Sequence, residues 1–145
     1  MNRIIGTFRS NEAVLWARAK MGLEGPVGPC HTFSLVDEND EFVAVFIISD
    51  NNGHAACIHY AAKEGAYWMT PNFINSLMSF VFFMLNLSRL TAPIRAGNKR
   101  SRQVAEKYGF VYEGTMRNAF PDGEDCVLLS FLKDEFVNHR WFNRG

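Results

Sequence analysis

The stretch NKRSRQVAEKYGFVYEGTMRNAFPDGEDCVLLSFLKDEF (98–136) carries the clearest structural pattern in the chain. Its first part (99–109) predicts a short helix that ends at Gly109, a residue suited to a helix C-cap. Residues 110–120 and 124–136 predict two strands, which a Pro-Asp-Gly turn joins into a hairpin. A helix and then a β-hairpin are therefore expected near the end of the chain.

The N-terminal part predicts a short strand at residues 4–8 and a helix at residues 11–21. Ser10 precedes this helix and suits its N-cap. The apolar face of the helix is expected to include three residues: Val14, Leu15, Met21. Residues 22–30, with several glycines and prolines, predict a loop.

Three antiparallel strands are predicted next. Residues 31–38 and 41–50 flank Asn39-Asp40, a tight-turn pair, and so indicate a hairpin. A third strand is expected at residues 54–62, after a second turn rich in asparagine and glycine.

A strongly apolar helix follows. Thr70 suits an N-cap and Pro71 the first helical position. FINSLMSFVFFMLNL (73–87) is too short to span a bilayer comfortably and carries polar residues, so it predicts a buried core helix. Four aromatic residues are expected in the core: Phe73, Phe80, Phe82, Phe83. Residues 90–97 predict a strand, in which Pro93 favours an edge or a splayed position.

The predicted order β-α-β-β-β-α-β-α-β-β indicates one α/β domain on a mixed sheet over residues 1–145. The net charge of zero argues against a broad surface for nucleic acid or for an anionic membrane. The cysteines and histidines show no ligand spacing, so no metal site is predicted. The N-terminus lacks a signal-peptide pattern, and the protein is expected to be cytoplasmic.

The C-terminal stretch resembles the end of a GCN5-related N-acetyltransferase (GNAT). The family pattern is Asn-x-x-Ser, a helix ending in Lys-x-Gly-Phe, a Glu-Gly and an arginine, then a turn, an Asp and a hydrophobic strand ending in Glu. Ten residues match it: Asn98, Ser101, Lys107, Gly109, Phe110, Glu113, Gly114, Arg117, Asp125, Glu135. The chain is most similar to the ribosomal-protein N-terminal acetyltransferases, and among these to their bacteriophage-encoded relatives, since Trp68-Met69-Thr70 precedes the long helix. The resemblance implies the GNAT fold, a mixed and mostly antiparallel sheet with helices on both faces.

The resemblance implies transfer of an acetyl group from acetyl-CoA to a primary amine, either a protein N-terminus or a small molecule. It implies a bacterial or phage-infected host cytoplasm and allows a homodimer. Such chemistry needs backbone N–H groups for the pyrophosphate, a donor for the acyl oxygen, a base for the amine and an acid for the thiolate.

The family holds the pyrophosphate on the turn before the long helix and the first turn of that helix. The expected cofactor-binding residues are Tyr60, Ala61, Ala62, Gly65, Ala66, Tyr67, Trp68, Met69, Thr70, Asn98 and Ser101. Tyr67 stands where the family usually has glycine or alanine, and Lys63 supplies the nearby positive charge. The sequence leaves open whether the rings of Tyr67 and Trp68 fold away from the helix start or cover it.

The candidate catalytic residues are His59, Ser101 and Asp125. His59 is the best-matched base by pKa, and the resemblance lets Asp125 meet the acceptor amine. Asn98 and Ser101 equally allow a structural interpretation, in which Asn98 ends a strand and Ser101 caps a helix. The tyrosine acid of many family members falls on Ala105, and we place Tyr108 on a different face of that helix.

Two functions remain open at this point. One is an N-acetyltransferase, favoured by the retained Asn98 and Ser101. The other is a catalytically degenerate GNAT-fold module for binding or assembly, such as a phage protein, favoured by the bulky Tyr67 and by the alanine at position 105.

Overall fold

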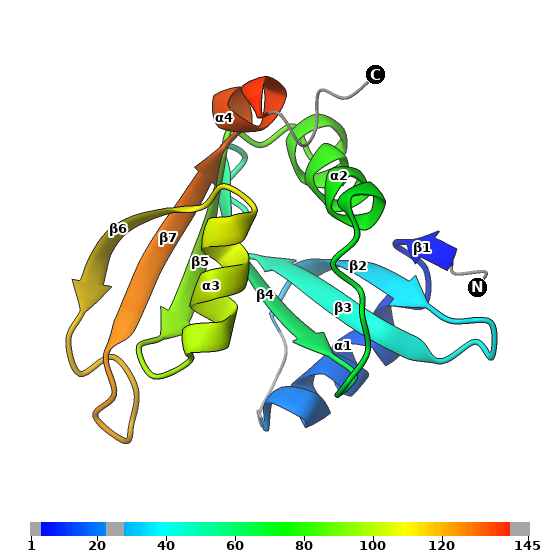
Figure 1. Ribbon diagram of the computed structural model, residues 1–145, viewed down its shortest axis with the longest axis horizontal. Coiled ribbons are helices and arrows are strands. Elements are labelled where there is room, and N and C mark those ends of the chain that lie inside the picture. Colours follow the sequence, from blue (N-terminus) through cyan, green and yellow to red (C-terminus); the bar gives the residue numbers. More distant parts are fainter. Residues whose placement is uncertain (1–3, 23–27, 140–145) are drawn as a thin grey trace.

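Seven strands form one sheet in the order β1-β2-β3-β4-β5-β7-β6 in the computed structural model, which describes residues 4–22 and 28–139 (Figure 1). The strands are β1 (Ile4–Gly6), β2 (Cys30–Val36), β3 (Phe42–Ser49), β4 (Ala55–Ala62), β5 (Arg89–Arg95), β6 (Val111–Met116) and β7 (Cys126–Leu132). The helices are α1 (Ser10–Met21), α2 (Pro71–Ser79), α3 (Lys99–Lys107) and α4 (Lys133–Asn138), with a π-helical turn at Phe80–Met84. All pairs are antiparallel except β4 with β5. The predicted α/β fold and element order are confirmed, with the π-turn and α4 as additions.

The start of α1 differs from the prediction. Arg9, in the left-handed region at φ 53°, is the N-cap, and Ser10 is already helical. The Ser10 hydroxyl donates to the Thr7 carbonyl and therefore serves the preceding loop. Val14 is buried as expected, but Leu15 is 67% exposed, because the helix presents Ala13 and Ala17 to the sheet. Residues 23–27 of the predicted loop lie outside the described residues.

The β2–β3 hairpin forms as predicted. Asp40 adopts φ 64° in the turn, and the Asp37 carboxylate accepts hydrogen bonds from the backbone N–H groups of Asn39 and Glu41. Every residue of β3 except Ser49 is buried. The central position of this strand, between helices on both faces, explains its continuous apolar sequence.

The apolar helix begins at the predicted residues. Thr70 is the N-cap, its Oγ1 accepts from the Phe73 N–H at 3.2 Å, and Pro71 occupies the first helical position. Beyond Ser79 the helix widens into the π-turn, where the Leu85 N–H donates to the Phe80 carbonyl. The wider turn changes which side chains face inward. The core prediction was therefore wrong for Phe83, which is 53% exposed.

The C-terminal half differs from the prediction in two places. Pro93 lies in an interior strand, not at an edge, and it follows the last β4–β5 pair, so the splayed alternative is confirmed. The last strand ends at Leu132 rather than at residue 136, because α4 begins there and the Glu135 carboxylate accepts from the Leu132 N–H at 3.0 Å. Tyr108 caps α3, and Gly109 follows at φ 104°.

The sheet separates two apolar clusters. The smaller lies between α1 and the strands β2–β4, and includes Ala13, Ala17, Val45 and Ile47. The larger lies on the other face, where α2, the π-turn, α3 and α4 cover the sheet, and includes Phe73, Leu77, Leu129 and Phe131. Within residues 4–22 and 28–139, no helix combines the length and apolarity needed to cross a membrane.

Candidate functional site

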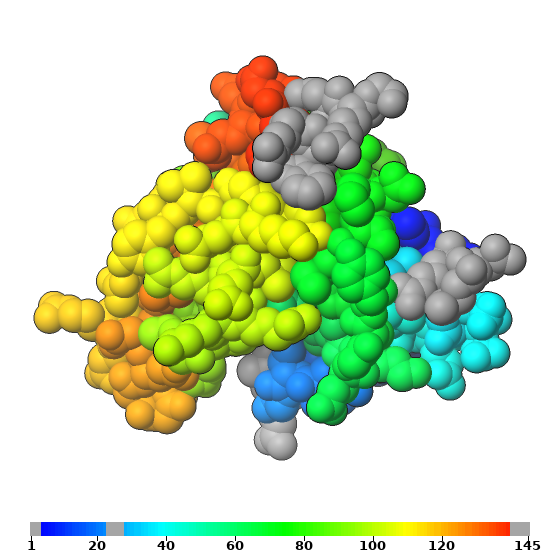
Figure 2. All heavy atoms as spheres, in the orientation of Figure 1, coloured from blue at the N-terminus to red at the C-terminus, as the bar shows by residue number. Residues whose placement is uncertain are grey.

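The sheet opens between β4 and β5. These neighbouring parallel strands pair only at Ala55–Arg89, Ala56–Leu90 and Cys57–Thr91, after which they diverge (Figure 1). The opening holds a groove of about 1340 Å³. In the space-filling view, α3 and the segment leading into α2 stand side by side over this opening, with α1 below them (Figure 2).

Most predicted site residues line this groove. They come from β4, the following loop and α3: His59, Tyr60, Ala61, Ala62, Gly65, Ala66, Tyr67, Trp68, Met69, Asn98, Ser101. Thr70 and Asp125 do not line it. Segments distant in sequence therefore meet at one groove, and the last turn of α1 and the β6–β7 loop extend it through Lys20 and Phe120.

The two rings of the loop before α2 behave differently. Trp68 is 3% exposed and packs its indole against the rings of Phe46, Tyr60 and Phe73, with centroid distances of 5.3, 5.2 and 6.2 Å. Tyr67 is 62% exposed, and its hydroxyl donates to the Met69 carbonyl at 3.2 Å. The Trp68 ring thus belongs to the core, whereas the Tyr67 ring stays at the groove surface.

Tyr108 also lies in the groove, so the prediction that it occupies a different face of α3 from Ala105 is wrong. It lines the groove together with Ala105, since residues three apart on a helix share a face. Its hydroxyl donates to the Met69 carbonyl at 2.7 Å and so joins the end of α3 to the loop before α2. Burial raises the pKa of Tyr108. The spacing of three residues between Ala105 and Tyr108 was the sequence signal that could have placed both on one face of the helix.

Asn98 and Ser101 meet at the start of α3. Asn98, not Ser101, caps the helix, because its Oδ1 accepts from the Ser101 N–H at 3.2 Å. This leaves the Ser101 hydroxyl available to another partner. Its Oγ lies 3.1 Å from the Tyr60 hydroxyl oxygen, across the groove.

His59 lies on the opposite face of β4 from Tyr60, as strand alternation requires. It pairs with Ile47, a member of the cluster under α1. Burial lowers the pKa of His59, and the nearby Asp50 charge opposes this effect. Burial therefore favours the neutral imidazole, which is the form that can accept a proton.

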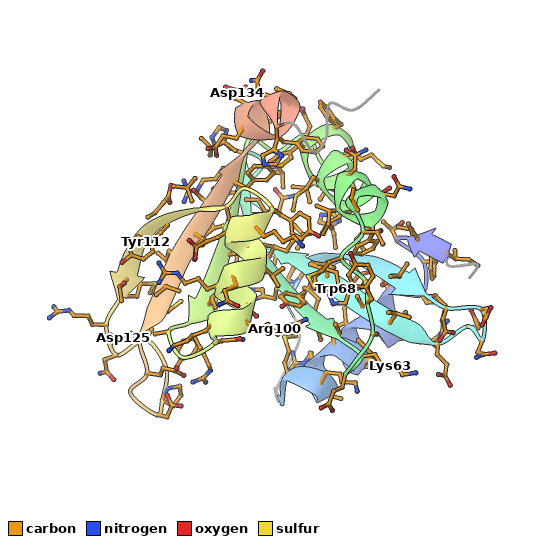
Figure 3. The ribbon with its side chains drawn as sticks, in the orientation of Figure 1. Lys63, Trp68, Arg100, Tyr112, Asp125 and Asp134 are labelled. Atoms are coloured by element: carbon orange, nitrogen blue, oxygen red, sulfur yellow. The ribbon has the colours of Figure 1, made fainter. Side chains whose placement is uncertain are left out.

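Asp125 has a defined place in the loop between β6 and β7. Its Oδ1 accepts from the Asn118 N–H at 2.9 Å, and its carbonyl accepts from the Ala96 N–H at 2.9 Å. It lies at the β7 end of this loop (Figure 3). These contacts favour a structural role.

Glu113, the match to the Glu-Gly segment, forms an ion pair. Its carboxylate accepts from both terminal nitrogens of Arg89, one at 3.1 Å, and from the buried Ser130 hydroxyl at 2.7 Å. The Arg89 hydrogen bond, followed by that of Ser130, lowers the pKa of Glu113 to about 2. This network fixes β6 to β5 and β7 at the irregularity between Tyr112 and Gly114.

Positive charge predominates along the groove. Four lysine and arginine side chains line it: Lys20, Lys63, Arg95, Arg100. Glu64 is the one carboxylate among the described residues that does so. Arg95 is paired with Asp122 and Glu124, both at 2.9 Å. Arg100 extends from α3 toward the side on which Lys63 lies (Figure 3). No group of three or more His, Cys, Asp or Glu residues in the described part of the chain is arranged to hold a metal ion.

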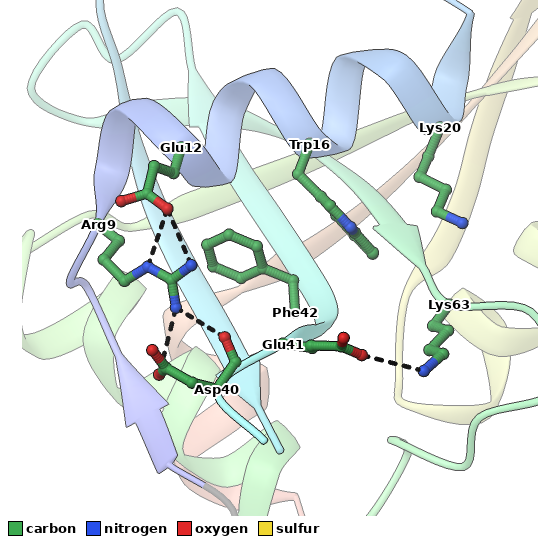
Figure 4. A pocket seen from close by; sticks show the side chains of 8 residues that line it. All are labelled: Arg9, Glu12, Trp16, Lys20, Asp40, Glu41, Phe42 and Lys63. Atoms are coloured by element: carbon green, nitrogen blue, oxygen red, sulfur yellow. Dashed lines mark hydrogen bonds and ion pairs between the residues drawn. The ribbon is translucent and has the colours of Figure 1, made fainter. Parts of the chain in front are cut away.

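A second hollow of about 500 Å³ lies between α1 and the β2–β3 turn (Figure 4). Arg9 bonds there to Glu12 and the Asp40 carbonyl, and its guanidinium lies 4.5 Å from the centre of the Phe42 ring. Lys63 pairs with Glu41 at 3.6 Å. Its acidic groups thus have partners within the hollow itself, and we do not assign it a ligand.

The model of the acetyltransferase (GNAT) domain family matches residues 4–111, more than half of the chain. The chain belongs to this family. The match begins at β1 and ends at the start of β6, so it contains β4, the loop before α2 and α3, which form the walls of the groove. The resemblance inferred from the C-terminal residues is confirmed.

One curated relative and two solved structures illustrate the likeness. The "Putative ribosomal N-acetyltransferase YdaF" of Bacillus subtilis (strain 168) is 30% identical over 89 residues, which cover 53% of this chain and 49% of that protein. The chain thus matches about half the length of this relative. The spermidine/spermine N-acetyltransferase SpeG of Vibrio cholerae superposes with a TM-score of 0.80 at 13% identity, covering 96% of this chain and 99% of that one. The ribosomal-protein-S5-alanine acetyltransferase of Vibrio fischeri gives 0.72 at 19% identity, covering 93% and 95%. These structural likenesses establish the fold.

Proposed function

We propose that this chain is a single-domain N-acetyltransferase that transfers an acetyl group from acetyl-CoA to a primary amine. The observation that carries the proposal is the groove between β4 and β5, whose two walls bring together the loop before α2 and the start of α3. Membership of the GNAT acetyltransferase family supports it.

The described residues fit an anionic cosubstrate. The start of α2, with its N-cap Thr70, follows directly after Met69, the last residue of the preceding loop that lines the groove, and offers backbone N–H groups and the positive end of the helix dipole at its edge. Lys63 and Arg100 add positive charge from the loop and from α3. Since Trp68 packs into the core, its indole does not stand in the way, and Tyr67 flanks the approach with its exposed ring.

The groove also offers candidates for the chemical steps. Neutral His59 can accept the proton that the attacking amine loses, directly or through water. Ser101 and Asn98 lie at the start of α3, where they can contact the arm that carries the thioester. Acetyl-CoA, when bound, supplies the activated acyl group. The chain's own residues orient this group and move protons.

The acceptor to test first is a protein N-terminus. The named relatives include both a ribosomal-protein acetyltransferase and spermidine acetyltransferases. A polyamine carries several positive charges, and the described groove residues include only Glu64 as a carboxylate to receive them. A peptide amine carries one charge and suits this lining better.

The test combines binding with turnover. Isothermal titration of the chain with acetyl-CoA is expected to give a defined one-to-one isotherm. Acetyl-CoA at 100 times its Kd should add about 2.7 kcal/mol to the free energy of unfolding and so raise the melting temperature. Release of free CoA thiol is then followed with a panel of peptides that have free N-termini and with spermidine. Mass spectrometry identifies the acetylated product.

Charge-matched variants sharpen the binding test. Arg100→Gln should weaken acetyl-CoA binding, whereas Arg18→Gln, on α1 and outside the groove lining, should leave it unchanged. Absence of any heat or melting shift at millimolar acetyl-CoA would contradict the proposal. Binding without transfer to any amine would favour the alternative, a GNAT-fold module that has lost its chemistry.

A further inference from the structure

Two hydroxyl groups meet across the groove. Tyr60 reaches from β4 and Ser101 from the first turn of α3, with 3.1 Å between their oxygen atoms. Both residues line the groove, from opposite walls. A flexible chain threaded along the groove therefore passes this pair.

The Tyr60 ring is held in place by its neighbours. Phe46 stacks on it at a centroid distance of 5.2 Å with an interplanar angle of 17°, and Trp68 packs against it at 5.2 Å. Because the ring is fixed by aromatic packing, its hydroxyl is directed at α3 before any ligand arrives. Trp68 therefore has a second role besides filling the core, because its ring supports the ring of Tyr60.

On the other wall, a hydrogen bond to the backbone fixes the position of Ser101. Asn98 caps α3 through the Ser101 N–H, which sets the position of the serine at the helix start. Ala105 lies one turn further along, on the same face of α3, and also lines the groove. An alanine has no proton to give, so this helix face has room but no acid of its own at that position.

The other tyrosine hydroxyls of the groove are engaged elsewhere, and the His59 imidazole belongs to the other face of β4. Tyr108 and Tyr67 both donate to the Met69 carbonyl, at 2.7 and 3.2 Å. His59 points from the opposite face of β4. The Tyr60–Ser101 bond, by contrast, joins two side chains of the groove that can each give and accept a proton.

We propose that Tyr60, oriented by Ser101, is the general acid that protonates the departing thiolate of acetyl-CoA. This inference rests on the proposed acetyl transfer. The Tyr60 phenol on β4 would then donate the proton that the alanine at position 105 of α3 cannot supply.

The proton balance is simple. The amine nitrogen forms the new C–N bond while the C–S bond breaks and leaves its electron pair on sulfur. Tyr60 gives its proton to that sulfur, directly or through the Ser101 hydroxyl, which accepts one proton and passes on its own. The amine loses a proton to its base and hence to solvent, and the phenolate recovers one from solvent.

The decisive variants keep the packing and remove the proton. Tyr60→Phe retains the stacked ring, and kcat is expected to fall about 100-fold, the lower end for general acid catalysis, while the Kd of acetyl-CoA by calorimetry changes little. The basic limb of the kcat–pH profile, which a donor that must be protonated produces, should disappear in this variant. Ser101→Ala should give a smaller loss of kcat. Tyr112→Phe, outside the groove lining, is the matched control and should behave as wild type.

A rescue experiment separates acid catalysis from packing. The double variant Tyr60→Phe/Ala105→Tyr returns a phenol to the groove from α3 and should recover part of the lost kcat. A purely structural role for Tyr60 predicts no rescue, because the second substitution does not restore the contact with Ser101.

The outcomes separate the assignment of Tyr60 as the acid from the proposed acetyl transfer on which it rests. If wild type transfers acetyl groups and Tyr60→Phe does so with a similar kcat and pH profile, the acid assignment is overturned and the proposed function stands. If Tyr60→Phe fails to fold, an unchanged kcat and an unchanged pH profile in Ser101→Ala overturn it equally. If wild type binds acetyl-CoA and transfers nothing, both proposals fall together.

Discussion

The two halves of the sheet are stabilised in different ways, and the groove lies where they part. In the N-terminal half, β3 is buried along almost its whole length, between α1 on one face and α2 on the other. In the C-terminal half, β6 is exposed at every position except Gly114, which is half-buried. Apolar burial fixes the first half, whereas the second combines apolar burial of β5 and β7, through Leu90, Leu129 and Phe131, with charged and polar contacts that hold the exposed β6.

The polar contacts of the second half concentrate at its two ends. Arg89 and Glu113 link β5 to β6 near one end. At the other end, Arg95 bonds to Asp122 and Glu124, and the Glu124 carboxylate also accepts from the Gly97 N–H at 2.8 Å. These contacts add to the ladder hydrogen bonds that join β7 to β5 and β6 and to the apolar packing of β5 and β7.

The largest expected effect tests this division directly. Ile48 in β3 is fully buried, and Val111 in β6 is 51% exposed. Ile48→Ala should lower the free energy of unfolding by about 2–5 kcal/mol, because it leaves a cavity in the core. Val111→Ala should change it by about 0.5 kcal/mol or less. Urea denaturation followed by circular dichroism measures both. Comparable losses in the two variants would contradict the difference in apolar burial between β3 and β6.

Asn98 gives the next largest effect and concerns the wall formed by α3. Asn98→Ala removes the N-cap and should lower the free energy of unfolding by about 1 kcal/mol. It should also weaken acetyl-CoA binding. Asn98→Asp keeps a capping oxygen but places a negative charge beside an anionic ligand, so it should weaken binding while leaving stability close to wild type.

Thermal melts and calorimetry of the two Asn98 variants separate the cap from the contact. If Asn98→Asp binds acetyl-CoA as tightly as wild type, Asn98 is a structural cap and takes no part in the site. Equal stability losses in both variants would instead mean that the Oδ1 bond to the Ser101 N–H is not what holds the start of α3.

Much of the fold could be predicted because its signals are local. The turn at Asp40, the Thr70-Pro71 helix start and the family pattern after Asn98 each lie within a few consecutive residues. The errors arose where tertiary contacts decide. Arg9 replaces Ser10 as the cap of α1 because its guanidinium bonds to Glu12 and to the Asp40 carbonyl.

The site was predictable in outline but not in its contacts. The resemblance indicated the loop and α3, and both line the groove. It could not show that Trp68 packs inward while Tyr67 stays at the surface, since that depends on the aromatic side chains of β3 and α2. The pairing of Tyr60 with Ser101 joins residues 41 positions apart, and no local pattern announces it.

A smaller effect is expected from Glu113, the charged link of the second half. Its folded pKa of about 2 lies below the ordinary value of 4.5, so the unfolded chain binds more protons between these values. The stabilisation is present above about pH 4.5 and is lost as the pH falls toward 2. Glu113→Gln should remove this acid-dependent part and cost about 1 kcal/mol or less at neutral pH, because the side chain is 40% exposed.

Urea denaturation of wild type and Glu113→Gln across this pH range provides the measurement. Glu106→Gln is a suitable control, since it removes an exposed helix pair with Arg102 and should cost about 0.3–0.5 kcal/mol. If the free energy of unfolding falls as steeply with decreasing pH in Glu113→Gln as in wild type, other carboxylates cause this fall. The C-terminal half of the sheet would then not depend on the Arg89–Glu113 link.

The smallest effect is expected from His59, on the strand that borders the groove from the apolar half. Burial lowers its pKa in the folded protein below the ordinary 6.5, so the unfolded chain binds the proton more readily. The free energy of unfolding should therefore fall as the pH drops below 6.5 through the folded pKa, and His59→Gln should flatten this part of the curve. His54→Gln, at the exposed residue directly before β4, keeps His59 and should retain the slope. If His59 is also the base, acetyl transfer should persist at pH values where an unburied histidine would already be charged, and His59→Gln should lose turnover while keeping acetyl-CoA affinity. A variant that loses the pH slope but keeps full turnover would assign His59 to the packing of the first half alone.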